Sequence, residues 1–124
     1  MRILLIDDDK DLCQLTQKVL TKSGYTVDAF YDAESAIGHA RVFTPNLILM
    51  DIMLPGLSGP EIISELKADP YFKNIPVIFL TALVSGNEDS LGDEGIMVAG
   101  VQYQTIGKPY EIDRLLSIVK RYAK

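Results

Sequence analysis

Residues 48–56 read ILMDIMLPG, and one acidic side chain, Asp51, interrupts a run of apolar residues. Leu47 to Met50 precede it, and Ile52 to Leu54 follow it. A run this apolar is typical of a strand buried on both faces, where a lone carboxylate is costly unless it is paired or binds a metal. The rest of the sequence therefore has to supply a partner for Asp51.

Short apolar runs alternate with segments of helical period along the chain. The runs predict strands at residues 3–6, 25–31, 47–50, 77–80 and 101–106, each followed by a helix. Five such units indicate an α/β fold: a doubly wound, five-stranded parallel sheet with helices on both faces. A chain of 124 residues suits one domain spanning residues 1–124. Periodicity alone does not set the order of the strands.

Capping residues predict where the helices begin and end. Asp9 and Gly24 bound the first helix, Asp32 caps the second, Ser58 begins a capping box with Glu61, and Pro109 suits the first turn of the last helix. The positions that we expect to face the sheet are Leu12, Leu15, Val19 and Leu20 in the first helix, Ala33, Ala36, Ile37 and Ala40 in the second, Ile62, Ile63 and Leu66 in the third, and Ile112, Leu115, Leu116 and Val119 in the last.

The stretch between Thr81 and Lys108 is rich in glycine, with Gly86, Gly92, Gly95 and Gly100. A glycine inside a helix costs on the order of 1 kcal/mol relative to alanine. A fourth helix here is therefore either short, displaced or partly melted, or it is an ordinary helix whose glycines lie at its ends and in its loops.

Charged and polar side chains follow the predicted strands where the strands end. They are Asp7 and Asp8 after the first strand, Asp51 after the third, Thr81 after the fourth and Lys108 after the fifth. Ligands of open parallel sheets bind outside the carboxyl ends of the strands. Converging carboxylates repel unless a cation such as Mg²⁺ neutralises them. With a lysine and a hydroxyl added, these groups suit phosphoryl transfer, in which a carboxylate can act as the nucleophile.

At this point the sequence resembles the receiver domains of two-component response regulators. The motifs are RILLIDDDK, LILMDIMLPGLSG, IPVIFLTA and GKPY, and the resemblance covers essentially the whole chain. It implies a flavodoxin-like sheet with strand order 2-1-3-4-5. The roles that it implies are a phosphate-accepting Asp51, an acidic pair of Asp7 and Asp8 that holds one Mg²⁺ with Asp51, a backbone carbonyl of Met53 on the metal, a switch hydroxyl on Thr81, and a phosphate-contacting Lys108.

The resemblance also implies partners and a way of working. A sensor histidine kinase or a histidine phosphotransferase would donate the phosphoryl group, and a downstream protein or a covalently linked output domain would read the face around the fourth helix and fifth strand. The domain would not be an enzyme acting on a separate substrate. A stand-alone regulator and a receiver within a longer protein both fit the sequence.

Two other functions fit parts of the pattern. A degenerate receiver that binds a partner constitutively is the alternative, because the glycine-rich stretch departs from the family. A Mg²⁺-dependent phosphatase would need a second acidic residue, and Met53 occupies the place where haloacid-dehalogenase-like phosphatases have it. Family members also usually carry an aromatic residue three positions before the lysine. This chain has Thr105 there and Tyr103 five positions before it, which leaves the aromatic switch open.

Composition excludes several classes of function. The net charge of −5 and the pI of about 4.7 argue against direct binding to nucleic acid. No apolar run approaches the length of a membrane helix, so we expect no membrane partner. The single cysteine, Cys13, suits a reducing cytoplasm and a packing role. The single histidine, His39, falls off the apolar stripe of its helix, and we expect it at the surface.

Overall fold

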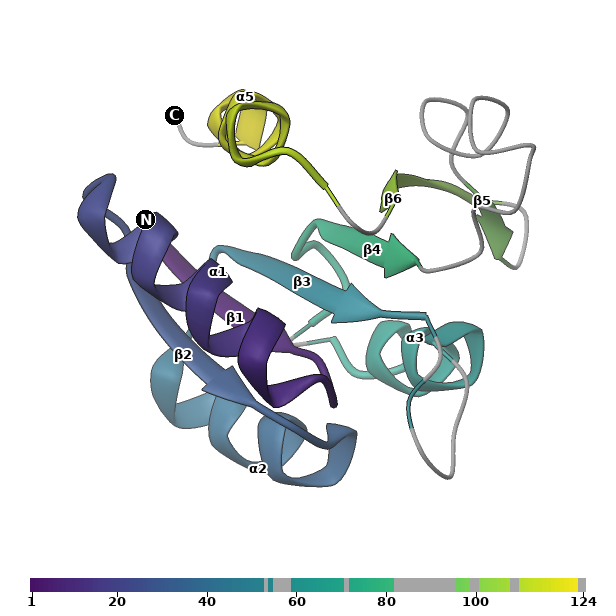
Figure 1. Ribbon diagram of the computed structural model, residues 1–124. Helices are drawn as coiled ribbons and strands as arrows, with labels where there is room; N and C mark the ends of the chain where they lie inside the picture. Colours follow the sequence, from purple (N-terminus) through teal and green to yellow (C-terminus); the bar gives the residue numbers. More distant parts are fainter. Residues whose placement is uncertain are drawn as a thin grey trace.

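Six strands form one sheet in the computed structural model (Figure 1), which describes residues 1–52, 54, 59–70, 72–81, 96–98, 101–107 and 110–122. The strands are β1 (Arg2–Ile6), β2 (Thr26–Phe30), β3 (Leu47–Asp51), β4 (Val77–Thr81), β5 (Ile96–Val98) and β6 (Val101–Gly107), in the order β2-β1-β3-β4-β6-β5. All neighbouring strands are parallel except β5, which pairs antiparallel with β6.

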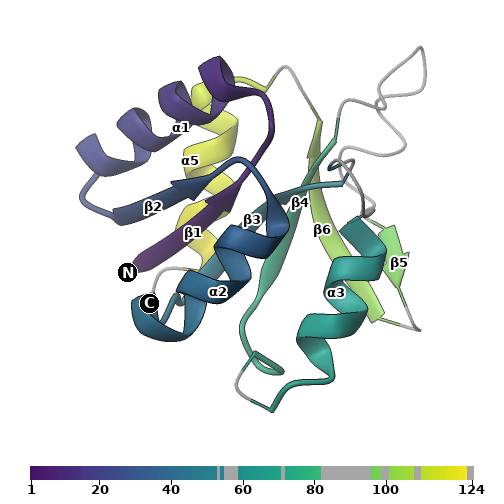
Figure 2. The ribbon, with the colours of Figure 1, turned by 90° about the horizontal axis from the view of Figure 1, so that it is seen from below.

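The described helices cover the sheet on both faces. They are α1 (Lys10–Lys22), α2 (Ala33–Phe43), α3 (Gly59–Lys67) and α5 (Ile112–Tyr122). Helices α2 and α3 lie on one face, and α1 and α5 lie on the other (Figures 1 and 2). None of the helices in the described part of the chain has the length and apolar character needed to cross a membrane.

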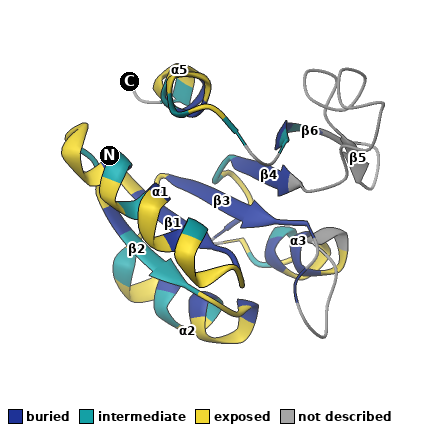
Figure 3. Ribbon diagram, in the orientation of Figure 1, coloured by how far each residue is buried: buried dark blue, intermediate teal, exposed yellow. Residues whose placement is uncertain are grey.

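Two apolar cores separate these layers. One lies under α2 and α3 and includes Leu4, Ile48, Ile62, Leu66 and Phe79; the other lies under α1 and α5 and includes Ile3, Leu20, Leu49, Leu115 and Val119. The central strand β3 is buried along its whole length (Figure 3). Burial on both faces explains why this strand reads as an unbroken apolar run up to Asp51.

The predicted parallel sheet is confirmed, with β6 as its fifth parallel strand and the order 2-1-3-4-5. The short edge strand β5 was not predicted from the sequence. It lies within the glycine-rich stretch where the sequence predicts a fourth helix. Residues 82–95 of that stretch are outside the described residues, so both alternatives for the fourth helix stay predictions.

The face of α1 differs from the predicted one. Leu15, predicted to face the sheet, is 50% exposed, and the buried positions are Cys13, Thr16 and Leu20. Thr16 can be buried because its hydroxyl forms a hydrogen bond with the hydroxyl of Tyr110. Thr16 is therefore buried on the sheet-facing side of α1 instead of Leu15, because its hydroxyl has a hydrogen-bond partner there.

The last helix begins later than the sequence predicts. It starts at Ile112 rather than at Pro109, and its first hydrogen bond runs from the Leu115 amide to the Glu111 carbonyl at 3.0 Å. Leu115 and Val119 are buried as predicted, and Ile118 is buried beside them.

The predicted caps of the first two helices are confirmed. Asp9 accepts a hydrogen bond from the Leu12 amide at 3.1 Å, and Gly24 ends the same helix region with a φ of 100°. Asp32 accepts from the amide of Ser35 at 2.8 Å and from its hydroxyl at 3.1 Å. These two hydrogen bonds lower the pKa of Asp32 below its ordinary value. Ser58 of the predicted capping box lies outside the described residues.

His39 has partners that the sequence does not predict. Its side chain is half-buried rather than fully at the surface, and its Nε2 lies 2.6 Å from Oδ2 of Asp28. The ring also packs between Phe30 and Phe43, with centroid distances of 5.1 and 5.7 Å. These contacts fix α2 to β2.

A single ammonium group organises the turn after α3. Lys67 donates to the carbonyls of Phe72, Lys73 and Ile75 at 3.3, 3.1 and 2.7 Å. Burial lowers the pKa of Lys67. The turn leads directly into β4, so this lysine helps to position that strand.

Replacing Lys67 by methionine should lower the free energy of unfolding by about 1–3 kcal/mol, because three carbonyls lose their charged donor. Urea unfolding measures the change. Lys73→Met, at an exposed side chain in the same turn, is the matched control and should change stability by less than about 0.5 kcal/mol. Equal effects of the two substitutions would contradict this role of Lys67.

Replacing Asp32 by alanine should destabilise the fold at neutral pH and have less effect in acid. Because the folded state lowers the pKa of Asp32, its contribution is complete above the ordinary carboxyl pKa and is lost as the pH falls through the lowered value. Urea midpoints of the variant and the wild type should therefore converge between neutral pH and about pH 2. A gap that stays constant would argue against the cap.

Candidate functional site

The ends of the parallel strands meet at one edge of the sheet. In the register of β1 with β3, Ile6 pairs with Met50, so Asp7 follows β1 beside Asp51 at the end of β3. Along the same edge, Asp51 pairs with Leu80 of β4. The sequence prediction that side chains from separate strands meet here is confirmed for these two carboxylates.

Three carboxylates come together at this edge. One oxygen from each of Asp7, Asp8 and Asp51 lies within 4.8 Å of the others. Asp7 is 1% exposed and Asp51 is 6% exposed, whereas Asp8 is exposed. The site therefore opens to solvent on the side of Asp8 and is closed by the sheet behind the other two.

Backbone hydrogen bonds fix the first of these aspartates. The Asp7 amide donates to the carbonyl of Phe30 at 3.0 Å, which holds the residue in line with β2. The Asp9 amide donates to Oδ1 of Asp7 at 3.0 Å and turns the chain into α1. Since Asp9 also caps α1, the start of that helix and the orientation of Asp7 depend on the same turn.

The carboxylate cluster fits a hard divalent cation. Mg²⁺ takes oxygen ligands and is usually bound by one or two carboxylates together with waters and phosphate oxygens. Two of the three aspartates are buried, and a bound cation would offset the repulsion between their carboxylates. Asp7, Asp8 and Asp51 are therefore the residues that could hold such an ion.

The remaining predicted site residues are described only in part. Thr81 ends β4, and its backbone pairs with Gly107, the residue before Lys108. This register is consistent with the predicted convergence of the fourth and fifth parallel strands. The side chain of Thr81 and the whole of Met53 and Lys108 lie outside the described residues, and their roles stay predictions.

Strand β6 carries an aromatic residue, Tyr103, two positions before Thr105, which occupies the place where the family usually has its aromatic residue. Thr105 is fully buried and pairs in register with Phe79. Tyr103 is 9% exposed, and its ring meets Phe79 edge-on at 5.7 Å. Residues two apart on a strand share a face, so the spacing in the sequence indicates that Tyr103 and Thr105 lie on the same face of β6. The tyrosine ring is packed into the core under α2 and α3.

Comparison with known proteins decides the family. The family model described as "Response regulator receiver domain" matches residues 3–120. This chain belongs to that family. The sequence match shows a receiver domain, and the strand order is the one that this family has.

Individual relatives support the assignment over almost the whole chain. The polar-differentiation response regulator DivK of Brucella anthropi is 32% identical over 120 residues, which cover 97% of this chain and 94% of that protein. The transcriptional regulatory protein YrkP of Bacillus subtilis is 32% identical over 98% of this chain, which spans only 50% of that regulator's length. The signal receiver domain of a histidine kinase from Syntrophus aciditrophicus has a TM-score of 0.78 and 27% identity, covering 98% of this chain and 88% of that one.

Neutralising Asp51 should stabilise the metal-free receiver. In EDTA, Asp51→Asn should raise the free energy of unfolding by on the order of 1 kcal/mol, because it removes one of three like charges within 4.8 Å. Added Mg²⁺ should stabilise the wild type more than the variant, since an ion that binds only the folded state shifts the equilibrium toward it. Urea unfolding with EDTA and with Mg²⁺ measures both effects.

Glu65→Gln, at an exposed carboxylate on α3, is the control for the change in charge. It should leave both the stability in EDTA and the gain from Mg²⁺ close to those of the wild type. An equal Mg²⁺ effect on wild type and Asp51→Asn would mean that the Asp51 carboxylate does not bind the ion.

Proposed function

We propose that this receiver, over residues 1–124, accepts a phosphoryl group on Asp51 from a phosphohistidine. The observation that carries the proposal is the cluster of three carboxylates at the strand ends, two of them buried. A carboxylate oxygen of Asp51 attacks the phosphorus, and the bond from phosphorus to the imidazole nitrogen breaks. The products are an acyl phosphate on Asp51 and a free histidine on the partner.

The other site residues would bind and orient the transferred group. Asp7, Asp8 and Asp51 would hold one Mg²⁺ per domain, with the backbone carbonyl of Met53 as a further ligand. When bound, the ion supplies positive charge that offsets the carboxylates and the phosphoryl oxygens. Lys108 would contact the phosphoryl group from the end of β6, and the hydroxyl of Thr81 would donate to one of its oxygens.

The acyl phosphate would act as a switch rather than as a step in turnover. The receiver assists its own phosphorylation and dephosphorylation, and it has no separate substrate. Phosphorylation would shift a two-state equilibrium in the segment after β4 and in β6. Family membership supports this use over the constitutive binding module. The acidic cluster that phosphorylation needs also supports it, since one oxygen of each carboxylate lies within 4.8 Å of the others.

Partners and location follow from the same proposal. A sensor histidine kinase or a histidine phosphotransferase would donate the phosphoryl group in the cytoplasm. A downstream protein or a linked output domain would respond, since the relatives include both a regulator of nearly this length and one of twice the length.

Incubation with acetyl phosphate and Mg²⁺ should give one phosphoryl adduct on the wild type and none on Asp51→Asn. Intact-protein mass spectrometry measures the adduct, and omission of Mg²⁺ should abolish or strongly reduce it. Asp11→Asn, at an exposed carboxylate in the first turn of α1, is the matched control and should still be modified.

A phosphorylated histidine kinase is the second donor in this experiment. The proposal fails if neither donor modifies the folded wild type, or if Asp51→Asn is modified as well as the wild type. Sustained release of phosphate from a small ester would instead support the phosphatase alternative.

A further inference from the structure

A hydrogen bond between two hydroxyl groups joins α1 to the segment that leads from β6 into α5. The Thr16 hydroxyl on α1 pairs with the hydroxyl of Tyr110, which lies two residues before the first residue of α5. Thr16 is 0% exposed, and Tyr110 packs against the apolar core under α1 and α5. A buried hydroxyl is costly to leave without a partner, so this pair favours one relative position of the two segments.

The Tyr110 side of this bond is close in sequence to Lys108, the predicted phosphate-contacting residue. Gly107 ends β6 and pairs with Thr81 of β4. Two residues, Lys108 and Pro109, connect Gly107 to Tyr110, and a proline limits the conformations open to the residue before it. The chain on either side of the lysine is therefore held in place, by β4 before it and by α1 after it.

The Thr16 side of the bond belongs to the helix that begins at the acidic pair. Asp7 and Asp8 directly precede Asp9, the N-cap of α1, and the Asp9 amide donates to Oδ1 of Asp7 at 3.0 Å. Thr16 lies about two turns further along the same helix. The hydrogen bond thus links the chain that carries the lysine to the helix that follows two of the three carboxylates.

We propose that Thr16 and Tyr110 are positioning residues for the phosphorylation of Asp51. Their hydrogen bond holds the segment that carries Lys108 against α1, so that the lysine and the acidic pair contact the same phosphoryl group. The proposal rests on the proposed function, since it takes Lys108 to contact that group. The Tyr110 hydroxyl, rather than the ring alone, is what sets the rate.

Loss of this hydrogen bond should affect the lysine side of the site and not the carboxylate side. Asp7 keeps its backbone bond to Phe30 and its bond from the Asp9 amide, and Asp9 still caps α1. A threonine within a helix can also turn its hydroxyl toward the carbonyl one turn before it, so α1 tolerates the loss of the tyrosine hydroxyl. Binding of Mg²⁺ and the rate of phosphorylation should therefore respond differently.

The test compares the wild type with Tyr110→Phe, which removes one hydroxyl and keeps the ring. Both are incubated with acetyl phosphate and saturating Mg²⁺, and intact-protein mass spectrometry follows the rate of adduct formation. We expect the variant to react about three- to tenfold more slowly, because one aligning hydrogen bond is lost. Its gain in stability from Mg²⁺, measured by urea unfolding, should equal that of the wild type, because the three carboxylates are unchanged.

Two control variants separate positioning from a general loss of stability. Tyr122→Phe removes a hydroxyl from another tyrosine that packs against the same core. Ile118→Val shortens a buried side chain of that core and lowers stability without touching either hydroxyl. Both controls should form the adduct within about twofold of the wild-type rate.

The second variant, Thr16→Val, removes the other hydroxyl of the pair and keeps the shape of the side chain. Because the two hydroxyls act together, Thr16→Val, Tyr110→Phe and the double variant should slow the reaction by the same factor. Thr21→Val, at an exposed threonine of α1, is the matched control and should react at the wild-type rate. The NMR spectrum of each variant shows whether it is folded.

Several results would overturn the positioning role while leaving the proposed function intact. They are a wild-type rate for Tyr110→Phe, multiplied effects of the two substitutions in the double variant, an equal slowing by Ile118→Val, or a loss of the Mg²⁺ effect in Tyr110→Phe. The last result would place the effect at the carboxylates. If the folded wild type gives no adduct with either phosphodonor, the proposed function fails and the positioning role fails with it.

Discussion

The parallel register of β1 and β3 is the constraint on which the rest of the site depends. Strands that run in the same direction end at the same edge, so the residue after Ile6 and the last residue of β3 must meet there. Both strands are buried by helices on two faces, and their interiors are therefore apolar. The acidic side chains follow the apolar interiors of these two strands, so the parallel register brings Asp7 and Asp51 together at one edge, where a cation could bind between them.

The two cores support the site by holding both strands in place. Both Asp7 and Asp51 stand at the ends of strands whose apolar residues pack into the layers on either side of the sheet. Local electrostatic cost at a binding site is commonly offset by packing elsewhere in the domain. The cap of α1 contributes at the same place. The Asp9 side chain accepts from the Leu12 amide, and the Asp9 amide donates to Oδ1 of Asp7. Fold and site therefore share hydrogen bonds.

Most of the sheet and of the acidic cluster could be predicted because their signals are local. An apolar run that ends in an acid identifies both a strand and its end, as Asp51 does. Features that depend on distant partners could not be predicted. Burial of Thr16 in place of Leu15 depends on Tyr110, which is 94 residues away. The strand β5 has three residues and exists through its pairing with β6, and the hydrogen bond between His39 and Asp28 joins two elements.

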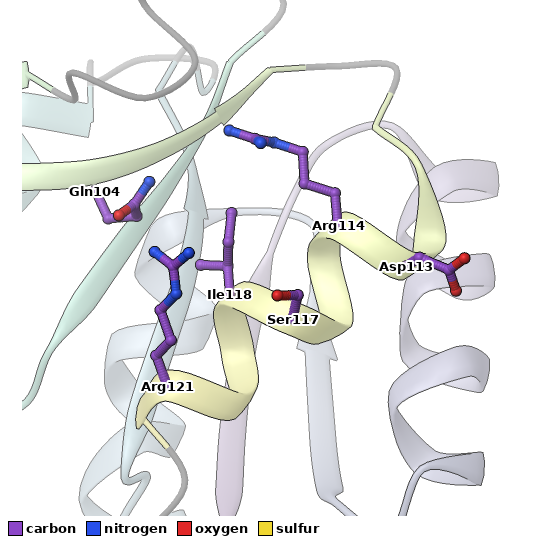
Figure 4. Close-up of a pocket in the computed structure, with 6 residues that line it drawn as sticks. All are labelled: Gln104, Asp113, Arg114, Ser117, Ile118 and Arg121. Atoms are coloured by element: carbon purple, nitrogen blue, oxygen red, sulfur yellow. The ribbon is translucent and has the colours of Figure 1, made fainter.

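Strand β6 pairs with β4 beside the predicted phosphorylation site and contributes side chains to both faces of the sheet. Successive residues of β6 face opposite layers of the fold. Tyr103 packs against Phe79 in the core under α2 and α3, while Gln104 faces α5, where it lines a pocket together with residues of that helix (Figure 4). The same strand is hydrogen-bonded to β4 from Ile78 to Thr81, the residue predicted to bind the phosphoryl group. Paired strands move as a unit because breaking their hydrogen bonds is costly. A displacement that begins at Thr81 would therefore reach the Tyr103 side and the Gln104 side together, without an aromatic residue at position 105.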